Sequence, residues 1–182
     1  MVAQFIPRKG HRVLLDALPA VWSAQPKCRV LLFGQGPEHA AIAAEVARRG
    51  WADRVRLPGF RDDLDRLLPC VDLVVHPAAL EGLGVSLLQA AACGVAMVAT
   101  RAGGIPEVVE DGVNGTLVAP GDAAALGAAI ARLLGDPPLR ARFGEAGRAL
   151  ALERFSVDAM VDGNRAVYEA VLREAATAAA AP

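Results

Sequence analysis

The stretch that decides the fold runs from Val71 to Ala99 and reads VDLVVHPAALEGLGVSLLQAAACGVAMVA. It opens on an apolar run at 71–75 and closes on another at 95–99, and neither run alternates polar with apolar residues. Strands of this kind are buried on both faces, as in a parallel sheet. The apolar segment between them, 86–93, is typical of a helix and ends at Gly94. The stretch therefore predicts a strand, a helix and a second strand parallel to the first.

The same alternation continues in both directions along the chain. Apolar runs predict strands at 29–33, 54–57 and 115–118, and residues 2–5 resemble the end of another strand. Helical stripes are predicted at 13–22, between Pro37 and Gly50, at 64–68, between Asp122 and Gly135, and after Ser156. We therefore predict an α/β fold, a Rossmann-like, doubly wound parallel sheet of about six strands with helices on both faces.

Composition fits one globular domain. The chain has 182 residues, of which 54% are hydrophobic and 21% charged, and its formal net charge of −1 gives no overall attraction to nucleic acid or to an anionic membrane. No apolar run approaches the ~20 residues that a membrane span needs. Three cysteines, Cys28, Cys70 and Cys93, match no zinc pattern. We expect them to be buried, unreactive thiols in a reducing cytoplasm.

The two ends of the chain set the expected domain boundaries. A strand already ends near residue 5, so we expect further sequence upstream. Residues 1–174 are predicted to form one domain. Residues 175–182 are an Ala-rich tail without an apolar stripe, and we expect this tail to fray.

The loop at 81–89 combines an acid, two glycines and a helix start. Glycines at 82 and 84 leave backbone N–H groups accessible at the helix N-terminus, which favours a diphosphate. Glu81 can accept hydrogen bonds from sugar hydroxyls, and Gln89, about two turns into the helix, can reach a ribose. An ordinary loop carboxylate is the alternative interpretation of Glu81 taken alone.

Two further loops follow predicted strands. Arg8 and Lys9 precede Gly10 and a helix start, an arrangement that suits a phosphate, with a solvated basic turn as the alternative. Gly103 and Gly104 permit a close approach of the backbone. Each of these loops lies where a doubly wound sheet binds its ligands, beyond the carboxyl ends of the strands.

Two other interpretations are disfavoured by the residues present. Gly34-Gln35-Gly36 resembles the start of a dinucleotide fingerprint, but His39 occupies the place of the third glycine, which argues against a plain NAD-binding module. The three histidines, His11, His39 and His76, show no metal-ligand spacing. We predict no metal site.

The order of these loops resembles one family. Nearly the whole chain is similar to the C-terminal, donor-binding domain of glycosyltransferase family 4, whose members are retaining enzymes with the GT-B fold. The motifs that carry this resemblance are Lys9-Gly10, Gly34-x-Gly36-Pro37, Pro58-Gly59-Phe60, Glu81 to Gln89, Gly103-Gly104-Ile105-Pro106-Glu107, Asp111-Gly112-Val113-Asn114-Gly115, and Phe155-Ser156. Single pieces are unspecific, whereas their order and spacing together are specific.

The resemblance implies roles for particular residues. Lys9 resembles the phosphate-binding lysine that offsets charge on the departing nucleoside diphosphate. Glu81 resembles the first of two glutamates separated by seven residues, which contacts the donor sugar. Lys9 and Glu81 are thus the implied catalytic residues. Donor-binding roles are implied for Arg8, Lys9, Gly10, Gly34, Gly59, Phe60, Glu81, Gly82, Leu83, Gly84, Val85 and Gln89.

Two positions depart from the family pattern. The second glutamate of the pair is Gln89 here, and a neutral amide holds ribose hydroxyls less strongly than a carboxylate does. The family also has an arginine five residues before the lysine, where this chain has Gln4. Arg8 is the residue that we expect to substitute for that cation.

The resemblance implies the transfer of a sugar, with retention, from a UDP- or GDP-linked donor to a hydroxyl of a glycan, lipid or polysaccharide precursor. No metal or other cofactor is implied. The N-terminal acceptor domain is absent from this chain, and any peripheral contact with the inner membrane would belong to that half. We expect the fragment alone to be inactive and to self-associate through its last helix. The alternatives are another GT-B enzyme, such as a nucleotide-sugar epimerase, and a non-catalytic nucleotide-sugar-binding module.

Overall fold

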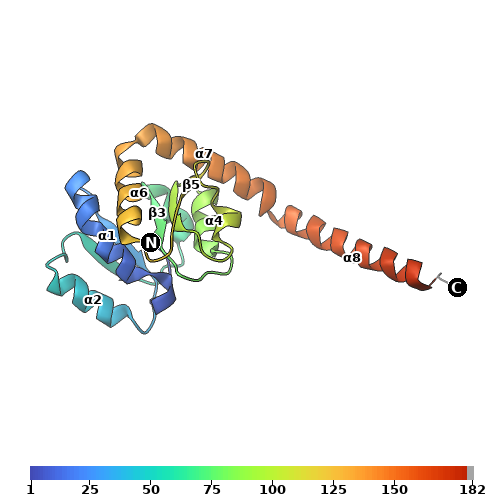
Figure 1. Ribbon diagram of the computed structural model, residues 1–182, viewed down its shortest axis with the longest axis horizontal. Coiled ribbons are helices and arrows are strands. Elements are labelled where there is room, and N and C mark those ends of the chain that lie inside the picture. The colour runs from blue at the N-terminus through green and yellow to red at the C-terminus, as the bar shows by residue number, and fades with distance from the viewer. Residues whose placement is uncertain (180–182) are drawn as a thin grey trace.

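Strands and helices alternate along the chain in the computed structural model, which describes residues 1–179 (Figure 1). The strands are β1 (Val30–Phe33), β2 (Val55–Gly59), β3 (Val74–His76), β4 (Met97–Thr100) and β5 (Gly115–Val118). The α-helices are α1 (His11–Ala24), α2 (His39–Arg48), α3 (Leu64–Leu67), α4 (Val85–Ala92), α5 (Ile105–Val108), α6 (Ala123–Gly135), α7 (Pro137–Arg154) and α8 (Val157–Ala179). Two short 3-10 helices are η1 (Pro7–Lys9) and η2 (Leu68–Cys70).

All strand pairs in the described part of the chain are parallel. β1 pairs with β2, and β4 pairs with β3 on one side and β5 on the other. The predicted strand at 2–5 is reduced to a bridge between Val2 and Phe33. Residues 1–179 therefore form five strands instead of about six, in a two-stranded and a three-stranded sheet instead of one. The segment at 2–5 follows the end of β1, with Ala3 N–H donating to Phe33 O at 3.0 Å, and then turns into η1.

Neighbouring residues of β4 face opposite layers of the molecule. Val98 belongs to one apolar core with residues of α1 and α6, such as Leu18 and Leu133. Met97 and Ala99 belong to a second core with residues of α4 and α5. Because side chains alternate along a strand, apolar residues in succession place helices on both faces, which confirms the predicted fold class.

Capping side chains mark the starts of the later helices. Asp122 accepts a hydrogen bond from Ala125 N–H at 2.8 Å and begins α6, as expected. Asp136 does the same for Leu139 at 2.9 Å and begins α7, a helix that the sequence pattern did not predict. The Ser156 hydroxyl accepts from Ala159 N–H at 3.2 Å, close to the start of α8.

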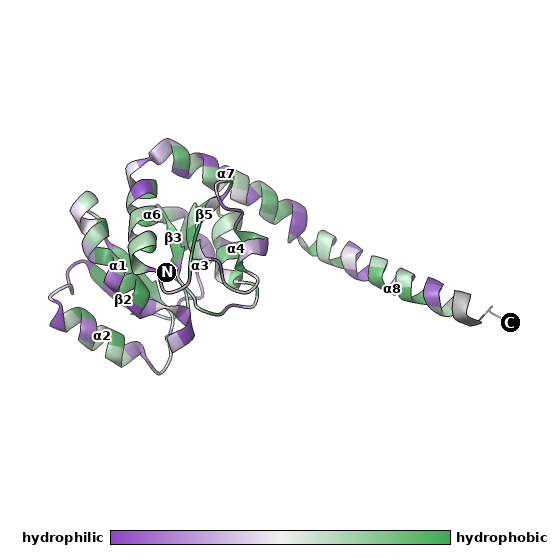
Figure 2. Cartoon of the chain, in the orientation of Figure 1, coloured by the Kyte–Doolittle hydropathy of each residue, from purple (hydrophilic) through white to green (hydrophobic). Residues whose placement is uncertain are grey.

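Helix α8 extends away from the rest of the molecule (Figure 1). Apolar and polar residues alternate along it in Figure 2. Its apolar side chains Val161, Val167, Tyr168, Val171 and Leu172 are 51–70% exposed. The helix continues to Ala179, five residues beyond the boundary predicted at 174, and residues 180–182 lie outside the described part of the chain.

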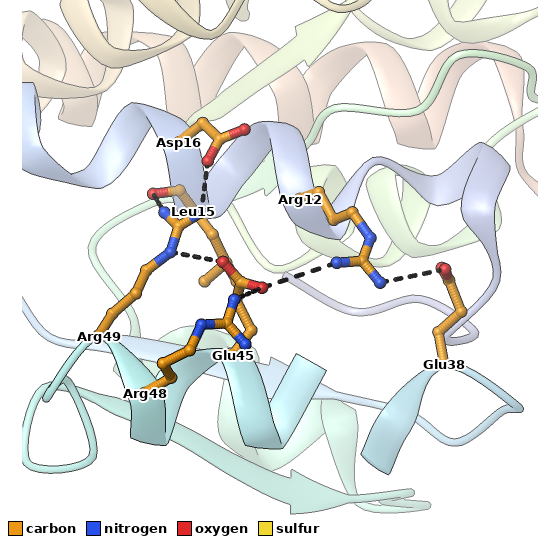
Figure 3. Close-up of polar contacts among 7 residues, drawn as sticks. All are labelled: Arg12, Leu15, Asp16, Glu38, Glu45, Arg48 and Arg49. Atoms are coloured by element: carbon orange, nitrogen blue, oxygen red, sulfur yellow. Dashed lines mark hydrogen bonds and ion pairs between the residues drawn. The ribbon is translucent and has the colours of Figure 1, made fainter. Parts of the chain in front are cut away.

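Charged side chains join α1 to α2 on the surface (Figure 3). Glu45 of α2 pairs with Arg48 and Arg49 of its own segment and with Arg12 of α1. Arg49 also donates to Asp16 of α1 at 2.8 Å. These hydrogen bonds from Arg48 and Arg49 lower the pKa of Glu45, so the network stays charged at neutral pH.

The three cysteines differ from their expected environment. All are free thiols, but Cys70 is exposed and Cys28 and Cys93 are half-buried, so the prediction of buried thiols was wrong. Cys70 ends the short helix η2, whose buried residue is Leu68. Burial raises the pKa of Cys28 and of Cys93, which keeps both thiols protonated and unreactive. No helix among residues 1–179 is long and apolar enough to cross a membrane.

Candidate functional site

The basic loop at 6–10 lies directly on the loop that follows β3. Gly10 ends η1 with a φ of 75°, and a Cβ at this position would stand 1.9 Å from the Pro77 carbonyl oxygen. Ala79 N–H donates to Arg8 O at 2.8 Å. The close approach predicted for Gly10 is therefore made to the backbone of a neighbouring loop.

This contact brings Lys9 and Glu81, 72 residues apart in sequence, into one ion pair. The Lys9 Nζ donates to Glu81 Oε2, and the two side chains are each 12% exposed. The same oxygen accepts a hydrogen bond from His76 Nε2 at 2.7 Å. Two donors therefore hold one carboxylate at the carboxyl end of β3, where ligands of such sheets bind.

The protonation states of this cluster follow from its surroundings. Burial raises the pKa of Glu81, but hydrogen bonds from Lys9 and His76 outweigh it and leave that pKa below its ordinary value. Burial lowers the pKa of His76 more than its bond to Glu81 raises it. At neutral pH, Glu81 is thus a carboxylate and His76 a neutral ring that donates from Nε2. Nδ1 is then free to accept from Ser86 Oγ, which lies 3.4 Å away.

The loop after β4 supports Glu81 from the other side. A Cβ at Gly103 would stand 1.9 Å from Glu81 O, and one at Gly104 would stand 2.0 Å from Gly82 O. Gly104 N–H donates to Gly82 O at 2.8 Å. These glycines approach the backbone at 81–82, which fixes the position from which the Glu81 side chain extends.

Helix α4 begins beside this carboxylate. Gly84, with a φ of 82°, precedes its first residue, and no side chain caps that end of the helix. Val85 is 64% exposed and Leu83 is 37% exposed. The partial positive charge of an uncapped N-terminus therefore faces an open surface next to Lys9 and Glu81, an arrangement that favours an anion.

Other predicted residues lie at the ends of β1 and β2, in η1 and in α4. Gly34 N–H donates to Gly59 O at 2.8 Å, which joins the ends of β1 and β2. Phe60 follows and is 67% exposed. Arg8 and Gln89 are also exposed. Within residues 1–179, no hydrogen bond or ion pair joins Arg8, Gln89 or Phe60 to Lys9 or Glu81.

The sequence reasoning missed His76 and Ser86. The signal that could have found His76 is its place at the end of a buried strand, five residues before the acid of the loop. His11 is buried as well, stacked on Phe5 with ring centroids 4.2 Å apart and without a hydrogen-bond partner for either ring nitrogen. Burial and the positive charges nearby lower the pKa of His11 to about 4. It is therefore a neutral core residue beneath the site.

A cavity of about 410 Å³ lies away from this cluster. Its lining includes Met1, Cys28, Leu31, Val71 and Leu134, and none of the predicted site residues. The clustered charges and the uncapped helix, and not this cavity, thus define the candidate site.

A parallel α/β domain with a lysine, a glutamate and a free helix N-terminus at its strand ends is suited to phosphorylated ligands. The family model described as glycosyl transferases group 1 matches residues 1–150. The chain belongs to this family, as the sequence resemblance indicates.

Individual relatives and solved structures support this family membership. The D-inositol 3-phosphate glycosyltransferase of Segniliparus rotundus is 37% identical over 183 residues, which cover 97% of this chain and 40% of the relative. Anabaena HepE, solved in complex with UDP-glucose, is 33% identical with a TM-score of 0.80, over 94% of this chain and 47% of that chain. The C-terminal domain of the group 1 family protein LpcC of Francisella tularensis shares the fold, with a TM-score of 0.76 at 23% identity, over 85% of this chain and 83% of that domain. The chain therefore spans less than half the length of the first two proteins.

Proposed function

We propose that this chain is the donor-binding half of a retaining glycosyltransferase, with residues 1–174 as the nucleotide-sugar-binding domain. The observation that carries the proposal is the Lys9–Glu81 ion pair beside the uncapped N-terminus of α4. Family membership supports it, and so does the relative HepE, which was solved with UDP-glucose. The likeness to a C-terminal domain of a group 1 protein supports the assignment to that half.

The reaction breaks the bond between the anomeric carbon and the diphosphate oxygen of the donor. The acceptor hydroxyl forms the new bond to that carbon and loses its proton, and the configuration is retained. Negative charge develops on the diphosphate, and the Lys9 ammonium and the first N–H groups of α4 would offset it. Glu81 would accept hydrogen bonds from the sugar, and Gln89 would do so from the ribose. These groups lower the barrier without requiring a metal ion or another cofactor.

The acceptor is proposed to be a glycan, lipid or polysaccharide precursor held by a separate N-terminal domain in the cytoplasm. The exposed apolar face of α8 is the surface proposed to associate with a second copy when that domain is missing. Light scattering between micromolar and millimolar concentrations tests this, with Tyr168→Glu as the variant that should remain monomeric. A constant monomer mass for the unmodified chain contradicts the association.

Thermal melting with UDP, GDP and their sugar conjugates tests donor binding. A ligand at about 100 times its Kd stabilises the folded state by roughly 2.7 kcal/mol. We expect one nucleotide to raise the melting midpoint, Lys9→Ala to abolish the rise, and Lys27→Ala to retain it. Lys27 is the matched control because it is an exposed lysine next to the cavity and away from the site. Equal shifts in the two variants would exclude the proposed role of Lys9.

A further inference from the structure

We propose that His76 is a positioning residue that holds the Glu81 carboxylate toward the donor sugar, and that it does so through Nε2 alone. The inference rests on the proposed function and deepens it. His76 is 1% exposed, so it does not itself reach a ligand. Any effect on the donor must therefore pass through Glu81.

The geometry allows His76 to hold the Glu81 carboxylate while Lys9 binds the diphosphate. Both residues donate to the same oxygen of Glu81, Oε2. Lys9 is also the cation that the diphosphate would attract, so a bound donor competes with Glu81 for it. The bond from His76 does not compete with phosphate, because the ring is buried at the end of β3. It keeps the carboxylate in place while Lys9 turns toward the leaving group.

The backbone around His76 is fixed on both sides. His76 pairs in register with Ala99 of β4. Two residues later, Ala78 O accepts a hydrogen bond from the hydroxyl of the buried Thr100. The charged and titratable groups that act on the ring are Glu81, Lys9, His11 and the amino group of Met1. Of these, Glu81 makes the hydrogen bond to Nε2, and Ser86 faces Nδ1.

Two amide variants separate the two ring nitrogens. The side-chain amide of His76→Gln reaches about as far as Nε2, so it retains a donor for Glu81. The amide of His76→Asn reaches only about as far as Nδ1, so it loses that donor. Ser86→Ala removes the contact to Nδ1 and is the matched control for the other side of the ring. All three variants are checked for folding by their melting midpoints.

Calorimetry then compares UDP with UDP-glucose, and GDP with GDP-mannose. We expect His76→Asn to lower the affinity for the sugar conjugate about tenfold, the loss of one hydrogen bond to a charged group, and to change the affinity for the free nucleotide less than about twofold. His76→Gln and Ser86→Ala should stay within about twofold of the unmodified chain for both ligands. A His76→Asn variant that keeps its affinity for the conjugate overturns the proposal, as does an equal loss in His76→Gln.

A second measurement does not depend on donor binding. The pKa of the Glu81 carboxyl, followed by carbon NMR in the ligand-free chain, should rise in His76→Asn and remain low in His76→Gln. An unchanged pKa in His76→Asn overturns the positioning role. Absence of any nucleotide binding by the unmodified chain counts instead against the proposed function, and the titration of Glu81 then decides the role of His76.

Discussion

Gly103 lies so close to Glu81 that a Cβ on residue 103 would stand 1.9 Å from the Glu81 carbonyl oxygen. The loop after β4 therefore packs against the loop after β3 through backbone atoms. The conformation of Gly103, with a φ of 53°, is also one that residues with a side chain rarely adopt. A residue with a side chain at position 103 would therefore meet both backbone strain and a steric clash with Glu81.

Gly103→Ala should separate these two effects when it is compared with Gly50→Ala. Gly50 has a φ of 71° but open space around it, so its substitution introduces strain alone. We expect a loss in the free energy of unfolding of about 1 kcal/mol for Gly50→Ala and about 3 kcal/mol for Gly103→Ala. Urea denaturation measures both. Equal losses would mean that the loops separate without cost and that Gly103 does not fix Glu81.

Gly144 of α7 provides a second steric comparison. A Cβ there would stand 2.0 Å from the Gly94 carbonyl oxygen at the end of α4, whereas one at Gly147 would meet its neighbours at an ordinary 3.6 Å. Gly144→Ala should lower the free energy of unfolding by about 2 kcal/mol or more because α7 must move. Gly147→Ala should raise it by up to about 1 kcal/mol, since alanine favours a helix. Chemical denaturation distinguishes the two, and a stabilised Gly144→Ala would contradict the observed packing.

The buried ring of His11 should make stability depend on pH. Its pKa falls from 6.5 to about 4 on folding, chiefly through burial, so the unfolded chain binds more protons between these values. The free energy of unfolding should therefore fall as pH decreases from about 6.5 to about 4. His11→Phe keeps an aromatic ring against Phe5 and should reduce that slope. Thermal melting across this range is the measurement, and an unaltered slope in His11→Phe would assign the dependence to other groups.

The stabilising contribution of Glu81 should be lost at the acidic end of the range. Its pKa is lowered by its hydrogen bonds in the folded state, so its contribution is complete above the unfolded value of 4.5 and is lost as pH falls through the lower folded value. Glu81→Gln should therefore be less stable than the unmodified chain at pH 7, with the difference shrinking below about pH 4.5. Urea titrations at pH 7 and pH 3 test this. If the difference in the free energy of unfolding between the two proteins is the same at pH 7 and pH 3, the Lys9–Glu81 ion pair contributes nothing to that difference.

Gln89 offers a test of the proposed contact with the ribose. Gln89→Glu supplies a carboxylate at an exposed position of α4, and hydrogen bonds to charged groups are about twice as strong as neutral ones. We expect affinity for UDP to rise about fivefold and affinity for 2′-deoxy-UDP to rise less. Equal changes for the two nucleotides would exclude a contact with the ribose 2′-hydroxyl.

Much of the fold was accessible from the sequence because the central strands β3 and β4 are largely apolar and because some of the later helices begin at capping side chains. Asp122 and Ser156 begin helices as predicted. Helix α7 was missed because its glycines, arginines and glutamates give no clear apolar stripe, although it buries Phe143 and Leu150. The segment at 2–5 was predicted as a strand end from its composition, whereas strand formation also depends on the pairing available.

The loops of the candidate site could be located from the sequence, whereas the contacts between these loops could not. The ends of the predicted strands located the loops, and a phosphate and a sugar as their ligands stay a prediction. No sequence pattern shows that Lys9 and His76 meet on one oxygen of Glu81, because that contact depends on how three loops pack. The same holds for Gly10 and Gly103, whose small size serves contacts between loops.

Those loops contact each other largely through main-chain atoms: Gly10 with Pro77, Gly103 with Glu81, and Gly104 with Gly82. Contacts between main-chain atoms depend little on which side chains the loops carry. Leu83 and Val85 are 37% and 64% exposed, and we expect their substitution to leave Lys9 and Glu81 in place. The domain is in this respect a scaffold in which a few exposed positions can vary while the loop framework around Lys9 and Glu81 stays the same.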